Sequence, residues 1–190
     1  MKRIIIVEYK NICLVAPEKE DIDIIFPEFN NRETCKFLDQ DDFSWWVLPK
    51  LREEKFLTEQ MSKHWHFMCI YKKDTEEIVW TISLHTVSER HRYATPWITI
   101  FSSFRNQWIW QQAMRLILKY AFEFQWFHKI NLYVWGTNIW WIKCYEKCWF
   151  TTIWTHKEHF WDYNNYVDVV DMEILVNEYE KLSKDWFTNI

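Results

Sequence analysis

Glycine is almost absent from this chain. The sequence has one glycine in 190 residues, where ordinary usage would give roughly 13. Glycine reaches positive φ without strain and lets the backbone approach a ligand closely, so a folded domain needs it at turns and binding loops. The 15 tryptophans exceed ordinary usage by a similar margin. We expect the glycine deficit and the tryptophan excess to share one cause.

An excess of positive charge and long apolar runs are also missing. The net charge is -4, which leaves no basic field for nucleic-acid phosphates. No apolar run approaches the roughly 20 residues of a membrane span. The run Ile4–Val7 ends at Glu8, too soon for a secretory signal peptide. The five cysteines are odd in number and scattered, which predicts reduced thiols in a cytoplasmic protein. They are Cys13, Cys35, Cys69, Cys144 and Cys148.

Linkers and repeats are not visible. The chain has four prolines and no serine-rich or charged run that separates two halves. Its length suits one domain with a substantial core. The sequence therefore predicts a single domain over residues 1–190.

The spacing of apolar residues predicts alternating strands and helices. A helix begins near Pro17, with acidic residues in its first turn, and Asn138 is suited to cap another. The predicted strands are Ile12–Val15, His66–Tyr71, Ile78–Val87, Trp97–Phe101, Ile130–Val134, Phe150–Trp154 and Tyr166–Leu175. Helices are predicted from Pro17 onward, over Leu51–Met61, over Met114–Phe122, from Asn138 to about Lys147, and after Asn177. This order indicates an α+β domain around a mixed sheet.

One loop between a predicted strand and a long helix has the spacing of a cofactor motif. Arg105, Trp108 and Trp110 fall at the three fixed positions of Q/R-x-x-G-x-G/A, the central motif of the GNAT superfamily of N-acetyltransferases, which the segment resembles. In that superfamily, successive backbone N–H groups and the helix N-terminus hold the pyrophosphate of coenzyme A. The resemblance implies that acetyl-CoA contacts the following loop residues. They are Arg105, Asn106, Gln107, Trp108, Ile109, Trp110 and Gln111.

The second half of the chain is similar to one branch of this superfamily, which includes ribosomal-protein alanine and spermidine acetyltransferases. Asn138-Ile139, then Ile142, Tyr145, Lys147 and Phe150 follow the branch's block N-x-x-A-I-x-x-Y-x-K-x-G-F. The resemblance implies a mostly antiparallel sheet flanked by helices, with two splayed parallel strands at the cofactor site. It also implies transfer of acetyl from acetyl-CoA to a primary amine, by direct attack in a ternary complex.

Roles for individual residues follow from the resemblance. Tyr145 would protonate the leaving thiolate as general acid, and Asn138 would contact the pantetheine arm. Backbone N–H groups of Ile98, Thr99 and Ile100 would polarise the thioester carbonyl. Some base must deprotonate the amine.

Glu158 is the first candidate for that base, with Glu89 and His85 as alternates. The family often carries a glutamate just before the glycine of position 97. This chain has Thr95 two places before position 97, so that base is predicted to be missing.

Tryptophan stands where the family pattern has glycine. The pattern expects glycine at positions 80, 97, 108, 110, 126, 149 and 154, and this chain has tryptophan at each. Independent mutations would not replace every one by the same bulky residue. We therefore hypothesise that UGA codons, which mean tryptophan in some genetic codes and glycine in others, were read as tryptophan.

Other readings of the same residues remain open. A literal indole at 108 or 110 would fill the pyrophosphate space, which would make the chain a GNAT-shaped binding module without cofactor. Tyr145 could be an ordinary packed tyrosine and Glu158 a surface acid. The pairs Cys144/Cys148, His64/His66 and His156/His159 lack a convincing partner set for zinc, so no metal is predicted. The expected partner is an amine, small or a protein N-terminus, with no nucleic acid or membrane; the chain would be a monomer or homodimer.

Overall fold

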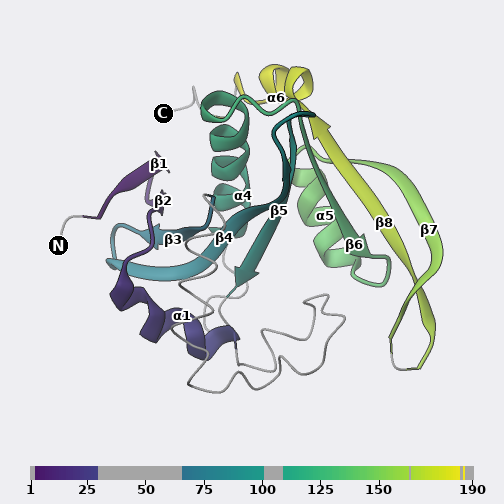
Figure 1. Ribbon diagram of the computed structural model, residues 1–190, viewed down its shortest axis with the longest axis horizontal. Coiled ribbons are helices and arrows are strands. Elements are labelled where there is room, and N and C mark those ends of the chain that lie inside the picture. The colour runs from purple at the N-terminus through teal and green to yellow at the C-terminus, as the bar shows by residue number, and fades with distance from the viewer. Residues whose placement is uncertain (1–2, 30–65, 101–108, 163, 185, 187–190) are drawn as a thin grey trace. The chain divides into compact units, whose positions relative to one another are not determined.

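The computed structural model describes residues 3–29, 66–100, 109–162, 164–184 and 186 (Figure 1). Its strands are β1 (Ile5–Tyr9), β2 (Ile12–Val15), β3 (Met68–Lys72), β4 (Glu77–Ser88), β5 (Tyr93–Ile100), β6 (Lys129–Trp135), β7 (Thr151–Trp161) and β8 (Tyr166–Leu175). Its helices are η1 (Lys19–Asp21), α1 (Ile22–Phe29), α4 (Ile109–Lys119), η4 (Tyr120–Phe124), α5 (Ile139–Lys147) and α6 (Val176–Leu182).

The described strands form a mixed sheet in the order β1-β2-β3-β4-β5-β6-β8-β7. The pairs β1/β2, β2/β3, β3/β4, β6/β8 and β7/β8 are antiparallel. The pair β5/β6 is parallel and joins Tyr93 to Lys129 and Ala94 to Ile130, at the start of both strands. The predicted α+β class, with a mostly antiparallel sheet and one parallel pair, is confirmed.

The chain divides into two compact units. The first unit contains residues 1–84 and 97–116, and the second contains residues 85–96 and 117–190. Each unit is described by itself. The single domain predicted over residues 1–190 stays a prediction.

The first unit takes its core from short apolar strands and one helix. Every side chain of β2 is buried, and so are Met68, Cys69 and Ile70 of β3. Ile25 and Phe26 are the buried side chains of α1. A polar contact fixes the start of this helical segment, because the carboxylate of Asp21 accepts a hydrogen bond from the Glu18 backbone N–H at 2.8 Å.

The second unit is built around β6 and β8. In β6, buried side chains alternate with half-buried or exposed ones, which is the period of a strand with one face toward a core. β6 pairs with β8 along the whole length of β6, from Lys129/Leu175 to Trp135/Val169. β7 lies at the sheet edge, and Figure 1 shows it beside β8 as a long hairpin. Most of its side chains are exposed.

Several predicted boundaries match the structure. β2 covers Ile12–Val15, β8 covers Tyr166–Leu175, and α5 ends at Lys147, as predicted. The helix after Pro17 is also confirmed. The predicted helix Leu51–Met61 lies outside the described residues.

One strand was not predicted and the ends of two others were wrong, for tertiary reasons. Ile4–Val7 was considered only as an apolar run, yet Ile5–Tyr9 forms β1 because it pairs with β2. β5 begins at Tyr93 instead of Trp97, since its first residues pair with β6. β7 continues to Trp161 instead of Trp154, because β8 supplies hydrogen-bonding partners along its length.

Candidate active site

The end of β5 carries the three residues predicted to polarise a carbonyl group. Ile98, Thr99 and Ile100 are the last residues of this strand. Thr99 is 2% exposed, and its Oγ1 has no hydrogen-bond partner among the described residues. A buried hydroxyl without a partner loses its hydration without compensation, unless a ligand supplies the missing hydrogen bond.

Helix α4 carries the described part of the predicted pyrophosphate loop. Arg105, Asn106, Gln107 and Trp108 lie outside the described residues, and α4 begins at Ile109. The first turn has no acidic side chain, so the positive end of the helix dipole is not neutralised locally. This donor set suits a phosphate, because the first N–H groups of a helix have no partner within it.

Of the two tryptophans predicted to obstruct this loop, Trp108 and Trp110, the structure describes Trp110. The Trp110 side chain is 5% exposed, and the neighbouring Ile109 is 6% exposed. Both side chains therefore point into the protein, while Gln111 is half-buried. The helix has apolar residues at helical spacing, with Ala113, Met114 and Leu116–Leu118 fully buried.

Asn138 and Tyr145 belong to one helix. Asn138 caps α5, because its side-chain oxygen accepts a hydrogen bond from the Trp141 backbone N–H at 3.4 Å. Tyr145 follows on the same helix, and its ring stacks on Trp141 with centroids 5.5 Å apart. It also meets Phe150 edge to face at 5.7 Å. The predicted cap is thereby confirmed, and Tyr145 is held by aromatic neighbours on two sides.

The surroundings of Tyr145 keep its phenol protonated. Burial raises the pKa of Tyr145 well above its usual value, and the nearby Cys148 and Cys144 raise it further. Burial likewise raises the pKa of the Cys144 thiol to about 12. At neutral pH the tyrosine hydroxyl is therefore neutral and can donate a proton or hydrogen bond, which is the state a general acid requires.

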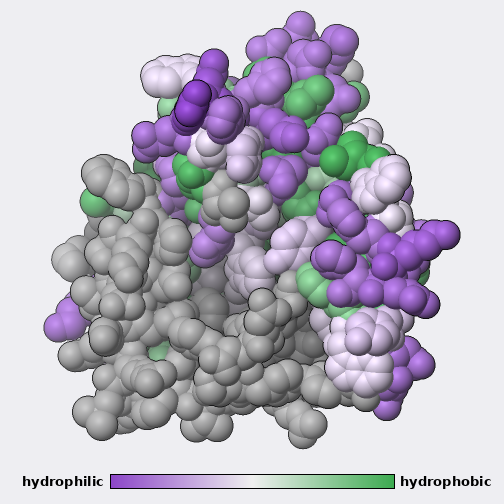
Figure 2. All heavy atoms as spheres, turned by 45° about the vertical axis from the view of Figure 1, so that its right-hand side comes forward, coloured by the Kyte–Doolittle hydropathy of each residue, from purple (hydrophilic) through white to green (hydrophobic). Residues whose placement is uncertain are grey.

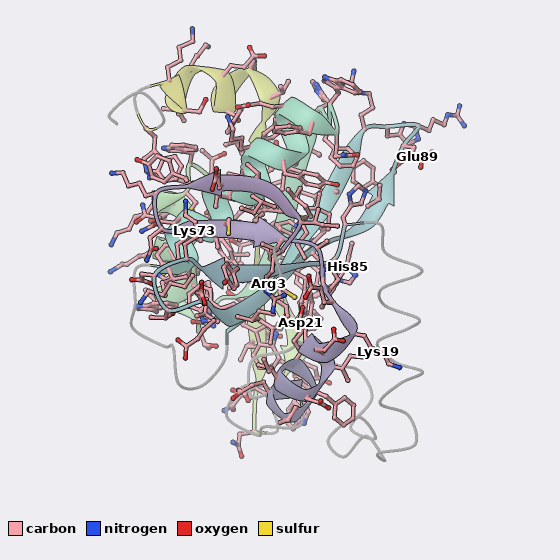
Figure 3. The ribbon with its side chains drawn as sticks, turned by 90° about the vertical axis from the view of Figure 1, so that its left-hand side faces the viewer. Arg3, Lys19, Asp21, Lys73, His85 and Glu89 are labelled. Atoms are coloured by element: carbon pink, nitrogen blue, oxygen red, sulfur yellow. The ribbon has the colours of Figure 1, made fainter. Side chains whose placement is uncertain are left out.

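The candidate bases lie on two strands and one turn of the second unit. Glu158 is exposed at an irregularity in β7, with φ of 49°, and its backbone N–H donates to Asp168 Oδ1 at 2.9 Å. His85 is half-buried on β4 and Glu89 is exposed. Figure 3 shows Glu89 at the turn that follows β4, and His85 further back along the strand. Each remains a candidate on chemical grounds.

A histidine–aspartate pair in the second unit was not predicted. His156 Nε2 lies 2.9 Å from Asp171 Oδ2, across the neighbouring strands β7 and β8. The His159 ring lies 5.0 Å from the His156 ring, centroid to centroid. No sequence signal could have shown the pair, because irregularities in β7 decide which of its residues lies opposite Asp171.

Metal-ligating residues do not gather in the described ranges. Within them, no three His, Cys, Asp or Glu side chains lie close enough together to hold an ion. Cys13, Cys69, Cys144 and Cys148 are buried free thiols. His64 lies outside the described residues.

Two features of the described residues bear on contact with a membrane. Among the residues the structure describes, no helix is long and apolar enough to cross a bilayer. On the face that Figure 2 shows, the described residues are mostly hydrophilic, with small hydrophobic areas scattered between them.

Comparison with known proteins gives no match by sequence and clear matches by fold. No protein-family model matches the chain, and no curated protein matches its sequence. A spermidine N-acetyltransferase from Vibrio cholerae, solved with CoA and spermine, is similar in structure, with a TM-score of 0.80 and 21% identity. The match covers 90% of this chain and 99% of that one.

A second solved structure matches an equal share of this chain. It is a GNAT-family acetyltransferase from Bacillus anthracis, with a TM-score of 0.76 and 15% identity over 90% of this chain and 98% of that one. At such identities the likeness concerns the fold. The mixed sheet, its parallel pair and these matches together show that the chain has the GNAT acetyltransferase fold, as its motifs predicted.

Proposed function

We propose that this chain is an acetyl-CoA-dependent N-acetyltransferase that moves an acetyl group onto a primary amine. The observation that carries the proposal is Tyr145, half-buried on the helix that Asn138 caps and packed between Trp141 and Phe150, with its phenol kept protonated. This is the arrangement that the family motif requires of a general acid. The GNAT fold supports the same conclusion.

The reaction is a direct attack in a ternary complex. The neutral amine attacks the thioester carbon, a C–N bond forms, the C–S bond breaks, and CoA leaves as a thiolate. A thiol has a pKa near 8.5 in water, far below that of Tyr145. Tyr145 therefore stabilises the departing sulfur as a hydrogen-bond donor, and the proton that is lost comes from the nitrogen of the tetrahedral adduct. Glu158, or alternatively His85 or Glu89, would take the amine proton.

The residues present fit acetyl-CoA. The first turn of α4 would hold the pyrophosphate, since a helix N-terminus presents backbone N–H donors and this turn has no acidic side chain. Thr99 has a buried hydroxyl without a described partner, next to the backbone N–H groups proposed for the thioester carbonyl. Asn138 would contact the pantetheine arm, in addition to capping α5.

The acceptor belongs to the class of primary amines. A polyamine is one candidate, because the similar Vibrio cholerae protein is a spermidine N-acetyltransferase solved with spermine. A protein N-terminus or another small amine is the other. The protein is proposed to act in the cytoplasm, where its buried free thiols would stay reduced, as a monomer or homodimer and without nucleic acid or membrane.

A binding module without cofactor is the second candidate. It is favoured by the printed tryptophans at positions 108 and 110, where the family loop has glycine. An indole at position 108 would occupy space that the pyrophosphate needs, whereas the Trp110 side chain is buried in the protein.

Two assays on two versions of the protein separate the candidates. Calorimetry would measure CoA binding, and release of CoA thiol would measure transfer to spermidine and to an alanine-terminated peptide. Both would be run on the printed chain and on the Trp108→Gly/Trp110→Gly variant. Transfer by either version, with initial rates showing a sequential mechanism, supports the proposal. If both versions fail to bind CoA, acetyl transfer is abandoned in favour of the binding module.

A further inference from the structure

Trp149 occupies a position that is built for glycine. Helix α5 ends at Lys147 with Cys148 as its C-cap, and Trp149 follows with φ of 74°. Its N–H donates to the Glu146 carbonyl at 3.0 Å, and the Phe150 N–H donates to the Tyr145 carbonyl at 3.1 Å. These are the two hydrogen bonds of a Schellman motif, in which the residue after the cap is left-handed and usually glycine. The apolar contact of that motif is also present, between Phe150 and Tyr145.

Trp126 occupies the same position at the end of another helix. The π-helix η4 ends at Phe124 with Gln125 as its C-cap, and Trp126 follows with φ of 53°. The Gln125 N–H donates to the Tyr120 carbonyl at 3.1 Å, and the Phe127 N–H donates to the Ala121 carbonyl at 3.0 Å. The Trp126 side chain is 69% exposed, so little packing offsets the strain that a Cβ suffers at this φ.

The other left-handed residues differ in place and character. They are Lys10, Glu76, Arg92 and Glu158, all charged and exposed. The first three lie in turns between strands and the fourth lies within β7. The two left-handed tryptophans alone follow helix C-caps, where the preference for glycine is strongest. Tryptophan, the bulkiest residue, therefore stands at the two described positions where the backbone most favours glycine.

Strand irregularities give a second, independent observation. The register between β3 and β4 shifts next to Trp80, and the register between β7 and β8 shifts next to Trp154. Glycine is a frequent residue at such bulges. Trp80 is fully buried and its Nε1 has no hydrogen-bond partner in the described structure. An indole N–H buried in this way is costly, because it loses its hydrogen bond to water.

We infer that the functional protein carries glycine at positions 126 and 149, and by the same cause at 80 and 154. The codon at these positions is then UGA, read as glycine by the host and printed here as tryptophan. One codon reassignment explains both the tryptophan excess and the glycine deficit. The inference rests on backbone geometry and does not depend on acetyl transfer.

The direct test is the mass of two tryptic peptides of the protein purified from its native host. Tyr120–Lys129 contains position 126, and Cys148–Lys157 contains positions 149 and 154. Each position read as glycine lowers the peptide mass by the difference between the two residues. The expected result is glycine at all three positions. Tryptophan at 126 or 149 would overturn the inference, and so would a UGG codon at either.

A measurement on recombinant protein tests the geometry by itself. Trp126→Gly and Trp149→Gly should each raise Tm by about 2–8 °C, because a left-handed L-residue costs about 1–2 kcal/mol and glycine does not. Trp140→Gly is the matched control, since Trp140 is exposed within α5. Glycine inside a helix should lower Tm by a similar amount. Loss of stability in all three variants would overturn the claim that positions 126 and 149 favour glycine.

Discussion

Arg3 and Asp21 form a two-pronged ion pair in the first unit. Arg3 Nη1 donates to Asp21 Oδ2 at 2.9 Å and Nη2 donates to Oδ1 at 2.8 Å, and Figure 3 shows the two side chains together. The Asp21 side chain is 2% exposed and that of Arg3 is 19% exposed. The pair therefore ties the start of the chain to the first turn of its first helical segment. The Arg3 guanidinium also lies over the Tyr71 ring, 5.2 Å from its centroid.

Arg3→Gln should destabilise the protein by about 3 kcal/mol, because it leaves the buried carboxylate of Asp21 without its cation. Urea unfolding followed by tryptophan fluorescence would measure the change. Lys73→Gln is the matched control, since Lys73 pairs with Glu8 at 3.1 Å and both side chains are more than one third exposed. That exposed pair should contribute less than about 1 kcal/mol. Equal losses in both variants would contradict the importance given to burial.

Tyr145→Phe should lower kcat by about 10²-fold or more while KM for acetyl-CoA changes little, because the lost hydroxyl acts on the departing sulfur. The prediction rests on the proposed function. Tyr166→Phe is the control, since Tyr166 is 62% exposed on β8. Steady-state kinetics at saturating amine would measure both. Unchanged kcat in a folded Tyr145→Phe protein would remove Tyr145 from the mechanism.

The raised pKa of Tyr145 also predicts a feature of the pH profile. The acidic form of this group persists throughout the neutral range. The rise of kcat/KM with pH should therefore come from deprotonation of the amine or its base. Below pH 10, we expect no decrease in kcat/KM that is present in the original protein and absent from Tyr145→Phe. Such a fall near neutral pH would show that the phenol titrates there, against the raised pKa of Tyr145.

Asn138→Ala should destabilise the protein by about 0.5–1 kcal/mol, the lower part of the range for an N-cap. The reason for the low value is the length of the capping bond, 3.4 Å between Asn138 Oδ1 and the Trp141 nitrogen. Asn138→Ser restores a capping oxygen and should recover most of that loss. If Asn138→Ser recovers stability while KM for acetyl-CoA stays raised, Asn138 has a second role toward the pantetheine arm. If neither stability nor KM changes in Asn138→Ala, both roles are wrong.

Alkaline pH should weaken the protein through Tyr179. Its hydroxyl donates to Glu123 Oε1 at 2.7 Å, and burial, followed by this carboxylate, raises the pKa of Tyr179 above its unfolded value near 10. A group with a raised folded pKa holds its proton more tightly in the native state. Its contribution to stability is therefore complete below pH 10 and is lost progressively as pH rises above that value.

Unfolding free energies measured between pH 8 and pH 11 would test this expectation. The printed chain should lose stability above pH 10, and Tyr179→Phe should lose less across the same interval, although its stability at pH 8 is lower. Identical slopes for the two proteins would show that Tyr179 does not contribute to the alkaline transition.

The sequence by itself determined the order of elements and much of the candidate site. Apolar spacing predicted β2, β8 and the extent of α5, because these elements are set by local periodicity and caps. The order Asn138, Tyr145, Phe150 predicted a capped helix that carries a tyrosine, and the structure has that helix. The sequence also showed tryptophan at positions where the family pattern has glycine. It did not show that Trp126 and Trp149 would have positive φ.

Tertiary structure decided everything that depends on residues far apart in the chain. The pair His156 and Asp171 follows from strand pairing and register, and a one-residue shift would turn a side chain to the other face. The pair Arg3 and Asp21 joins residues 18 apart in the chain, which no local pattern brings together. Strand β1 and the extended ends of β5 and β7 exist because neighbouring strands supply hydrogen bonds that no local pattern reveals. The left-handed backbone at Trp126 and Trp149 is likewise a product of the chain's path beyond each helix. Local periodicity fixes which residues are helical or extended, but only packing fixes which of them meet.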